Sequence, residues 1–267
     1  MIVDEIELTI DPDDPGGSLD VAFDIFRTAK SEPNTAEIKV WNLTPEKRFV
    51  LEEQGNVPVS VEAGYKDQTS QLFLGVARTV YTTREGADLI TVLQSGDGEK
   101  EHQSSRINVS IAAGATNQQA IDAVVKALAL GAGNSANAAT KIASAKPLFP
   151  QGAVLTGSAA QVLQRLMLSL GLEYSIQNGA LQVLTAGEPL AGTATKLTPE
   201  TGLVGSPSID NEGILTAQAL LIPEIFPGRL LVVESEFLSG NFRVESCKYV
   251  GDTAGNDWYV EVEAKKL

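Results

Sequence analysis

Several residue types that mark common protein classes are scarce in this chain of 267 residues. Cys247 is the only cysteine and His102 the only histidine, so an internal disulfide is excluded and a Cys–His catalytic pair is disfavoured. A lone cysteine is usually a small buried side chain rather than a nucleophile. We expect His102, which follows charged residues, to lie at the surface.

Long apolar runs are missing as well. No stretch of about 18 apolar residues occurs, so the sequence predicts no membrane span. The segment Met1–Glu7 carries neither a basic flank nor a cleavage site, and we expect no secretory signal there.

Positive charge is the next shortage. The chain has 20 Lys and Arg against 34 Asp and Glu, a formal net charge of −14. A nucleic-acid-binding face needs clustered basic side chains, so this class of function is disfavoured. The excess of acids fits either a surface that repels nucleic acid or a protein that is simply soluble, and the second reading is the simpler one.

Motifs of catalysis are absent from the sequence. It has no Walker phosphate loop, no His-Glu-x-x-His, no Cys-x-x-Cys and no Gly-x-Ser-x-Gly. The segment Gly96–Glu101 has carboxylates beside glycines, but it lacks the alternating oxygen ligands of a calcium loop and reads as a solvated turn. Carboxylate pairs for glycoside cleavage are available in any acidic protein, and nothing singles one out. We therefore expect no enzyme, no cofactor and no metal site.

The first third of the chain reads as β-structure, and we assign residues 1–105 to a first β-barrel domain. Apolar and polar residues alternate in four segments, as in half-buried strands: Ile6–Ile10, Val21–Phe26, Ala36–Trp41 and Val57–Ala63. Thr44 followed by Pro45 is typical of a helix start, so a short helix over Pro45–Gln54 is expected. We expect Trp41, Leu43 and Phe49 to close this barrel rather than to bind a ligand.

Residues 106–196 have a different pattern, which predicts an inserted α/β domain. Two helix starts resemble capping boxes, Thr116 with Gln119 and Ser158 with Gln161. The dipeptide at 178–179 is Asn-Gly between alternating segments, which indicates a tight hairpin. The small polar residues of Gly131–Ala139 predict a mobile loop, or else the continuation of a helix.

Residues 197–267 return to β-structure and form an expected second β-barrel domain. Strands are predicted over Ile214–Ile222 and Arg229–Glu234, followed by a hairpin. This region is small, so it needs a neighbour to bury its faces. The fold class that follows is mainly β (α+β), with two tube-like β-barrel or sandwich domains and a small α/β insertion.

Two segments look like one unit used twice. Residues 73–92 and 238–262 each contain a strand opened by a glycine, a polar turn, and a second strand that begins at an aspartate. This pairs Gly75 with Gly240 and Asp88 with Asp257, and it predicts internal pseudo-symmetry. A chance match of two ordinary hairpins is the alternative.

The segment Pro33–Leu43, Pro-Asn-x-Ala-x-Ile-x-Val-aromatic-Asn-Leu before a short helix, resembles the baseplate hub proteins of tailed bacteriophages related to the T4 hub. Further segments extend the resemblance over nearly the whole chain: residues 73–75, 163–184, 202–207, 226–228, 251–253 and Trp258. The residues that carry the family pattern are Pro33, Asn34, Trp41, Asn42, Leu43, Gly75, Gly228, Gly240, Asp252 and Trp258.

The resemblance implies two barrels related to the tail-tube fold. A homotrimer of such chains offers six similar barrels, and it would join a sixfold tail tube to a threefold central spike around the DNA channel. The implied partners are the spike, the tube or tube-initiator protein, other baseplate proteins and the tape-measure protein, while DNA passes without specific binding. The implied location is the tail baseplate of a virion, of contractile type, assembled in the host cytoplasm. The chain is shorter than the T4 hub.

Two other classes of function remain as alternatives. One is a carbohydrate-binding or adhesive β-protein, against which the expected lack of a signal and the aromatic content of only 6% both weigh. The other is a cell-wall hydrolase embedded in a tail, for which no motif is present.

Overall fold

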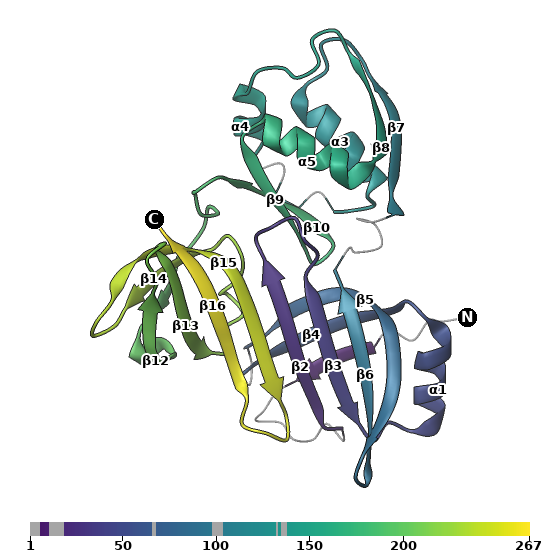
Figure 1. Ribbon diagram of the computed structural model, residues 1–267, viewed down its shortest axis with the longest axis vertical. Coiled ribbons are helices and arrows are strands. Elements are labelled where there is room, and N and C mark those ends of the chain that lie inside the picture. The colour runs from purple at the N-terminus through teal and green to yellow at the C-terminus, as the bar shows by residue number, and fades with distance from the viewer. Residues whose placement is uncertain (1–5, 11–18, 66–67, 98–103, 132, 135–137) are drawn as a thin grey trace. The chain divides into compact units, whose positions relative to one another are not determined.

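The computed structural model describes residues 6–10, 19–65, 68–97, 104–131, 133–134 and 138–267 (Figure 1). The chain is mainly β, as the alternating segments predict. It divides into two compact units. The first unit contains residues 1–28, 34–97 and 189–267, and the second contains residues 29–33 and 98–188.

The described residues of the first half of the first unit form six strands and one helix: β1 (Ile6–Ile10), β2 (Val21–Thr28), β3 (Thr35–Trp41), α1 (Pro45–Gln54), β4 (Val57–Tyr65), β5 (Gln68–Glu85) and β6 (Asp88–Gly96). The strands lie in the order β1-β4-β5-β6-β3-β2. All neighbours are antiparallel except β1 and β4, which are parallel. The predicted helix is confirmed: α1 begins after Thr44, whose Oγ1 accepts a hydrogen bond from Lys47 N.

The second half also has six strands: β11 (Thr195–Leu197), β12 (Leu203–Ile209), β13 (Ile214–Leu220), β14 (Leu230–Glu234), β15 (Ser239–Asp252) and β16 (Trp258–Lys266), with a 3-10 turn η1 (Pro199–Thr201). Its pairings repeat those of the first half one for one. Strand β11 is parallel to β14, and β14-β15-β16-β13-β12 follow in antiparallel order. The predicted duplication is therefore present in the topology, where β1 to β6 correspond to β11 to β16.

A β-bulge sits at the same place in both halves. One extra residue, Arg78 in β5 and Glu245 in β15, interrupts the pairing with β6 and β16. Asp88 and Asp257 hold equivalent positions, because each lies directly opposite the last residue of its long strand. The predicted match of these two aspartates is confirmed.

The predicted match of the two glycines is off by two residues. Gly75 precedes the bulged Arg78 by three positions, whereas Gly240 precedes Glu245 by five. Gly75 therefore corresponds to Phe242. The sequence comparison aligned the glycines and placed the length difference in the turn, and it had no means of locating the bulge.

The two halves form one continuous sheet rather than two separately closed barrels. Strand β2 pairs with β15 from Ala22, opposite Asp252, to Thr28, opposite Ser246. A single apolar cluster draws on both halves, and it includes Ile25, Ile38 and Tyr249. The division at residues 105 and 196 into separate barrel domains stays a prediction, since the two β-regions share this core.

The aromatic residues expected to close the first barrel behave differently from one another. Leu43 is buried, and Trp41 is half-buried at the end of β3. Phe49 was expected to pack, but its side chain is 66% exposed on α1. Its position in the helix turns it away from the core that Leu51 enters.

The second unit combines small sheets with helices: β7 (Arg106–Ile111), α3 (Asn117–Ala127), α4 (Ala139–Ser144), β8 (Ala153–Ser158), α5 (Ala159–Ser169), β9 (Leu172–Gln177) and β10 (Ala180–Thr185). The capping box of Thr116 and Gln119 is present in both directions. Ser158 is the residue before α5, but its side chain makes no capping hydrogen bond, so the second box is wrong. The Asn-Gly hairpin is confirmed by β9 and β10, with positive φ at Asn178 and Gly179.

The segment predicted as a mobile loop is tied down where the structure describes it. Gly131 pairs with Ala180, and the Asn134 amide donates to Val183 O at 2.9 Å. The alternative prediction, that a helix continues through this region, is confirmed in part, because α4 begins at Ala139. Residues 132 and 135–137 lie outside the described residues, so mobility stays a prediction.

Candidate functional site

Among the described residues, those suited to catalysis are not assembled into a reactive site. Cys247 is 1% exposed, and burial raises the pKa of its thiol to about 11, so the thiolate is scarce at neutral pH. His102 and residues 98–103 around it lie outside the described residues. Among the described residues, no group of three His, Cys, Asp or Glu side chains could hold a metal ion. No helix in that part of the chain is both long and apolar enough to span a bilayer.

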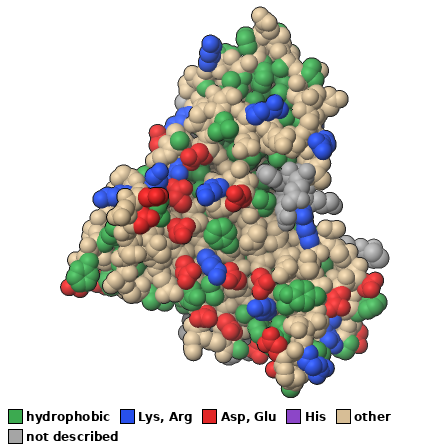
Figure 2. Space-filling view, in the orientation of Figure 1, with side chains coloured by type: hydrophobic (Ala, Val, Ile, Leu, Met, Phe, Trp, Pro, Cys, Tyr) green, Lys and Arg blue, Asp and Glu red, His purple; other side chains and the backbone are tan. Residues whose placement is uncertain are grey.

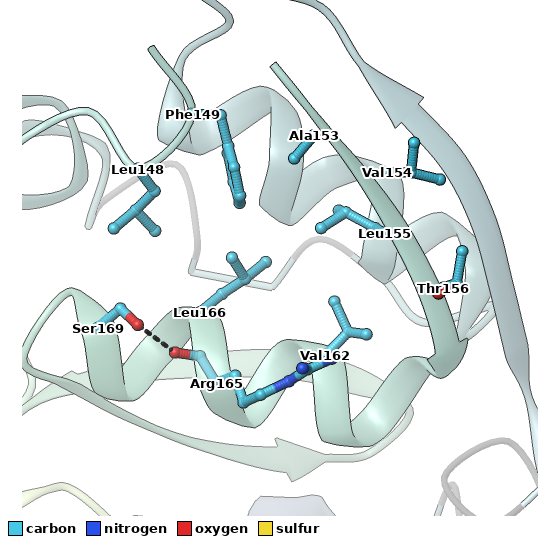
Figure 3. Close-up of a pocket in the computed structure, with 10 residues that line it drawn as sticks. All are labelled: Leu148, Phe149, Ala153, Val154, Leu155, Thr156, Val162, Arg165, Leu166 and Ser169. Carbon is cyan, nitrogen blue, oxygen red and sulfur yellow. Dashed lines mark hydrogen bonds between the residues drawn. The ribbon is translucent and has the colours of Figure 1, made fainter. Parts of the chain in front are cut away.

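A groove of about 370 Å³ lies in the second unit between β8 and α5 (Figure 3). Its walls are mostly apolar, with Leu148, Phe149 and Leu166 facing it. Arg165 is its one charged lining residue, and the Arg165 carbonyl accepts a hydrogen bond from Ser169 Oγ at 2.7 Å. Without a carboxylate or an imidazole beside the groove, it offers no acid–base pair.

The solvent side of the large sheet carries rows of charged side chains. Along β2, β3, β15 and β16, core-facing side chains alternate with side chains that face solvent. Figure 2 shows acidic side chains outnumbering basic ones over this sheet. We call this side the polar face, and its charged residues on these four strands include Asp24, Glu37, Lys39, Lys248, Glu261, Glu263 and Lys265.

Lys248 and Lys39 of the polar face are both held by carboxylates. Lys248 Nζ lies 2.7 Å from Asp24 Oδ2, and Lys39 Nζ lies 3.3 Å from Glu37 Oε1. The carboxylates of Asp24 and Glu261 raise the pKa of Lys248, so it stays charged. With Glu261 and Glu263, the four carboxylates of this set face three lysines including Lys265, so the face keeps a net negative charge. A hollow of about 610 Å³ on this face includes both glutamates.

Besides the outer edges of β1 and β11, two strand edges of the large sheet have no strand partner among the described residues. One is β12, which pairs only with β13. The other is the second half of β5, residues 79–85, which pairs with β6 on one side only. In the other half of the repeat, the equivalent part of β15 is the part that pairs with β2. The open edges are therefore the counterparts of a junction that already exists inside the chain.

The family-pattern residues near β3 fix local structure. Asn34 is buried, its Oδ1 accepts from Thr28 N at 3.0 Å, and its Nδ2 donates to Asp97 Oδ2 at 3.2 Å. It links the β2–β3 connection to the end of β6. Asn42 has a positive φ of 54°, and its side chain contacts both Asp88 Oδ1 and Leu89 N. Pro33 precedes this strand in the segment 29–33 of the second unit.

The pattern glycines differ in how tightly they are enclosed. A Cβ on Gly75 would lie 2.6 Å from the Phe73 ring, whereas one on Gly240 would lie 3.2 Å from the Phe242 ring. Gly228 has a positive φ of 88° in the turn before β14, where glycine is favoured.

The pattern residues of the last hairpin are structural as well. Asp252 Oδ1 accepts hydrogen bonds from Ala254 N and Gly255 N and so shapes the β15–β16 turn. Trp258 meets the Phe23 ring edge-on at 5.7 Å.

Gly251 lies in the family-pattern segment 251–253, but sequence reasoning gave it no packing role, and the structure encloses it more tightly than Gly75 or Gly240. A Cβ there would lie 2.3 Å from the Phe23 ring and 2.9 Å from the Trp258 ring. A glycine next to the pattern residue Asp252 was the one available signal. Its partners are far away in sequence, and only the β2–β15 junction brings Phe23 to it.

Comparisons with known proteins agree on one group. The family described as baseplate hub gp41 matches residues 6–264 of this chain. A search of curated protein sequences found no match. Among solved structures, a tail protein of Neisseria meningitidis MC58 is similar with a TM-score of 0.63 and 10% identity, covering 93% of this chain and 96% of that one.

Two further structures share the fold. The 43 kDa tail protein of prophage MuSo2 from Shewanella oneidensis gives a TM-score of 0.61 at 11% identity, covering 93% of this chain and 96% of that one. The E. coli c3393 protein, a type VI secretion component, gives 0.58 at 10% identity and covers 93% and 73%. The family match spans nearly the whole described fold, so the chain belongs to the baseplate hub gp41 family of structural proteins of the bacteriophage tail baseplate.

Proposed function

We propose that this chain acts as a trimeric hub, which joins the sixfold tail tube to the threefold central spike and lines the channel for DNA. The observation that carries the proposal is the internal repeat, in which β1 to β6 and β11 to β16 have the same pairings. Three chains would present six similar units to the tube while keeping threefold symmetry for the spike.

The polar face supports the channel part of the proposal. Its surplus carboxylates are unsuited to holding phosphates, and repulsion from them acts over roughly 8 Å at physiological salt. A wall of this kind lets DNA pass without binding it. Asp88 at the start of β6 and Asp257 before β16 add negative charge at one end of the large sheet.

The partners follow from the same role. We propose that the chain contacts the central spike, the tube or tube-initiator protein, the tape-measure protein and other baseplate proteins. The hub role is mechanical and needs no catalytic group, which fits the buried Cys247 and the apolar groove beside α5. We propose assembly in the host cytoplasm and incorporation into the virion.

The test is the native mass of the purified chain, alone and with the spike and tube proteins of the same phage. We expect a species of three 28.2 kDa chains that binds one spike trimer and one tube ring. Imaging of particles with an added tag on the chain should place it where tube meets spike. A monomer that binds cell-wall sugar and neither partner would instead favour the adhesive alternative.

A further inference from the structure

The groove in the second unit runs along the edge of a strand (Figure 3). Four consecutive residues of β8, 153–156, line it, and side chains along a strand alternate between the two faces of a sheet. A hollow over one face would be lined by every second residue, so this groove lies beside the strand. Strand β8 pairs with β7 on one side, and its other side has no strand partner among the described residues.

The open side of β8 presents unused backbone hydrogen-bonding groups. At the end of the β7–β8 pair, Ala159 N donates to Ser105 O at 3.0 Å. In an antiparallel ladder every second residue bonds its partner, so counting back from Ala159 turns the N–H and C=O of Leu155 towards β7. Those of Val154 and Thr156 therefore point towards the groove, and neither has a backbone partner elsewhere in the described part of the chain.

The walls opposite β8 are apolar and fixed. Val162 and Leu166 of α5 are buried in the core of the second unit, and Leu148 and Phe149 pack against the same core. Asn117 holds their segment in place, because its Oδ1 accepts a hydrogen bond from Leu148 N at 3.0 Å. A groove whose walls are already ordered binds a ligand at a lower entropic cost.

The shape and the free backbone groups of the groove favour an extended ligand. Residues 153–156 extend about 10 Å at roughly 3.3 Å per residue, and α5 extends about the same from Val162 to Ser169 at 1.5 Å per residue. Three or four residues of a strand match this length. A helix bonds its own backbone groups internally and would leave the N–H and C=O groups of β8 unused, whereas an extended segment can pair with them.

One charge in the groove has no counterpart. The guanidinium of Arg165 has no hydrogen-bond or ion-pair partner among the described residues. A planar guanidinium is suited to a carboxylate. Strand β8 is Ala-Val-Leu-Thr-Gly-Ser and contains no carboxylate, so pairing with β8 of a second copy would leave Arg165 unmatched. The fitting ligand is a different segment, which carries Asp or Glu.

We infer that the groove binds an extended segment of another protein, which adds a strand to the free edge of β8. Apolar side chains on one face of that segment pack against Leu166 and Phe149, and a carboxylate on the same face pairs with Arg165. Strand addition takes its affinity from backbone hydrogen bonds and its specificity from side-chain contacts. The inference is independent of the proposed trimer, because the groove lies wholly within the second unit.

A designed peptide tests the site on the whole chain. The probe is acetyl-Thr-Val-Thr-Glu-Thr-Val-Thr-amide, in which the two valines and the glutamate share one face of a strand. We expect saturable binding by fluorescence anisotropy, with shifts of amide NMR signals confined to β8, α5 and residues 148–149. Replacing the glutamate by lysine should weaken binding about tenfold. No saturable binding of the glutamate peptide up to millimolar concentration would overturn the inference.

Two variants of the chain test the groove from opposite walls. Thr156→Pro removes an N–H that faces the groove, at an edge position where proline is tolerated. Arg165→Glu reverses the charge on the exposed side of α5, and it keeps the test valid if Thr156→Pro does not fold. Each should weaken binding of the glutamate peptide about tenfold or more, and Arg165→Glu should come to prefer the lysine peptide.

Leu168→Ser is the matched control. Leu168 is 70% exposed on α5 but does not line the groove, so its replacement should leave binding unchanged. A loss as large as that of Arg165→Glu would contradict the assigned site. A dimer by native mass that Thr156→Pro abolishes would give the edge to a second copy and would also overturn the inference.

Methylation of the peptide amides tests the strand pairing itself. Only one edge of the added strand faces β8, and its N–H groups belong to every second residue. N-methyl groups on that alternate set should abolish binding, while N-methyl groups on the other set should leave it unchanged. Binding that survives both methylations overturns the strand addition, whereas the hub role does not depend on the result.

Discussion

Gly251 is a position where an added side chain would meet two aromatic rings. Its missing Cβ leaves room for the rings of Phe23 and Trp258, which pack edge to face over the β2–β15 junction. We predict that Gly251→Ala lowers the free energy of unfolding by about 1–3 kcal/mol, because the rings or the backbone must move. Urea denaturation measures this change directly.

Gly240→Ala is the matched control, since it lies in the same strand with a looser approach to a ring. It should cost clearly less than Gly251→Ala. The reverse order would mean that the rings of Phe23 and Trp258 give way more easily than the packing of this junction implies.

Cys247 gives the stability a pH dependence on the alkaline side. Burial raises its thiol pKa from about 9 to about 11, so the folded state favours the neutral thiol. This contribution is fully present below pH 9 and is lost as the pH rises from 9 towards 11, because only the unfolded thiol ionises there. Urea unfolding between pH 8 and about 10.5 should show the decline.

The variant Cys247→Ala isolates this contribution. It should flatten the decline without abolishing it, since burial also raises the pKa of Tyr249 well above its ordinary value. A slope identical to that of the natural chain would show that the thiol takes no part.

At the scale of the element, the two helix starts of the second unit offer a comparison. Thr116 Oγ1 accepts from Gln119 N at 3.2 Å, whereas Ser158 makes no capping hydrogen bond. We predict that Thr116→Ala costs about 1 kcal/mol of stability, while Ser158→Ala costs only a few tenths. Thermal unfolding of both variants under the same conditions decides between them, and equal losses would contradict the assigned caps.

Local signals explain which elements could be predicted from the sequence. Three such features are the cap at Thr44, the capping box at Thr116 and the turn at Asn178. Each depends on residues only a few positions apart, so a short stretch of sequence is enough to predict it. Ser158 has the same local pattern without the bond, because its neighbours are set by β8 as much as by α5. The exposure of Phe49 was likewise not predicted, because the sequence alone does not show which side of α1 faces the core.

At the scale of the whole molecule, the repeat could be predicted but its arrangement could not. The sequence shows matching hairpins in residues 73–92 and 238–262. It does not show the arrangement around them, which depends on contacts between residues far apart in the chain: the parallel pairs β1–β4 and β11–β14 and the junction of β2 with β15. The family-pattern residues were found by resemblance, and their placement supports structural roles such as that of Asn34. Gly251 was missed because its partner Phe23 lies on a distant strand.

The charge of the polar face leads to the last prediction. Glu261 and Glu263 are exposed on β16, while Lys39 and Lys248 of the polar face form ion pairs with Glu37 and Asp24. We predict that the assembled protein does not retain duplex DNA at about 0.15 M salt, and that Glu261→Lys with Glu263→Lys makes it do so, because repulsion becomes attraction within the screening length.

The control for this charge reversal changes the net charge equally at another place. Glu200→Lys with Glu224→Lys alters η1 and the β13–β14 connection, outside the polar face. If the face lines the channel, only the Glu261 and Glu263 variant should retain DNA, and added salt should release it with a steep dependence. Retention by both variants would indicate nonspecific binding anywhere on the surface, and retention by the natural protein would refute a repelling channel. Either result would leave the family assignment intact, since that depends on the fold and not on the charge.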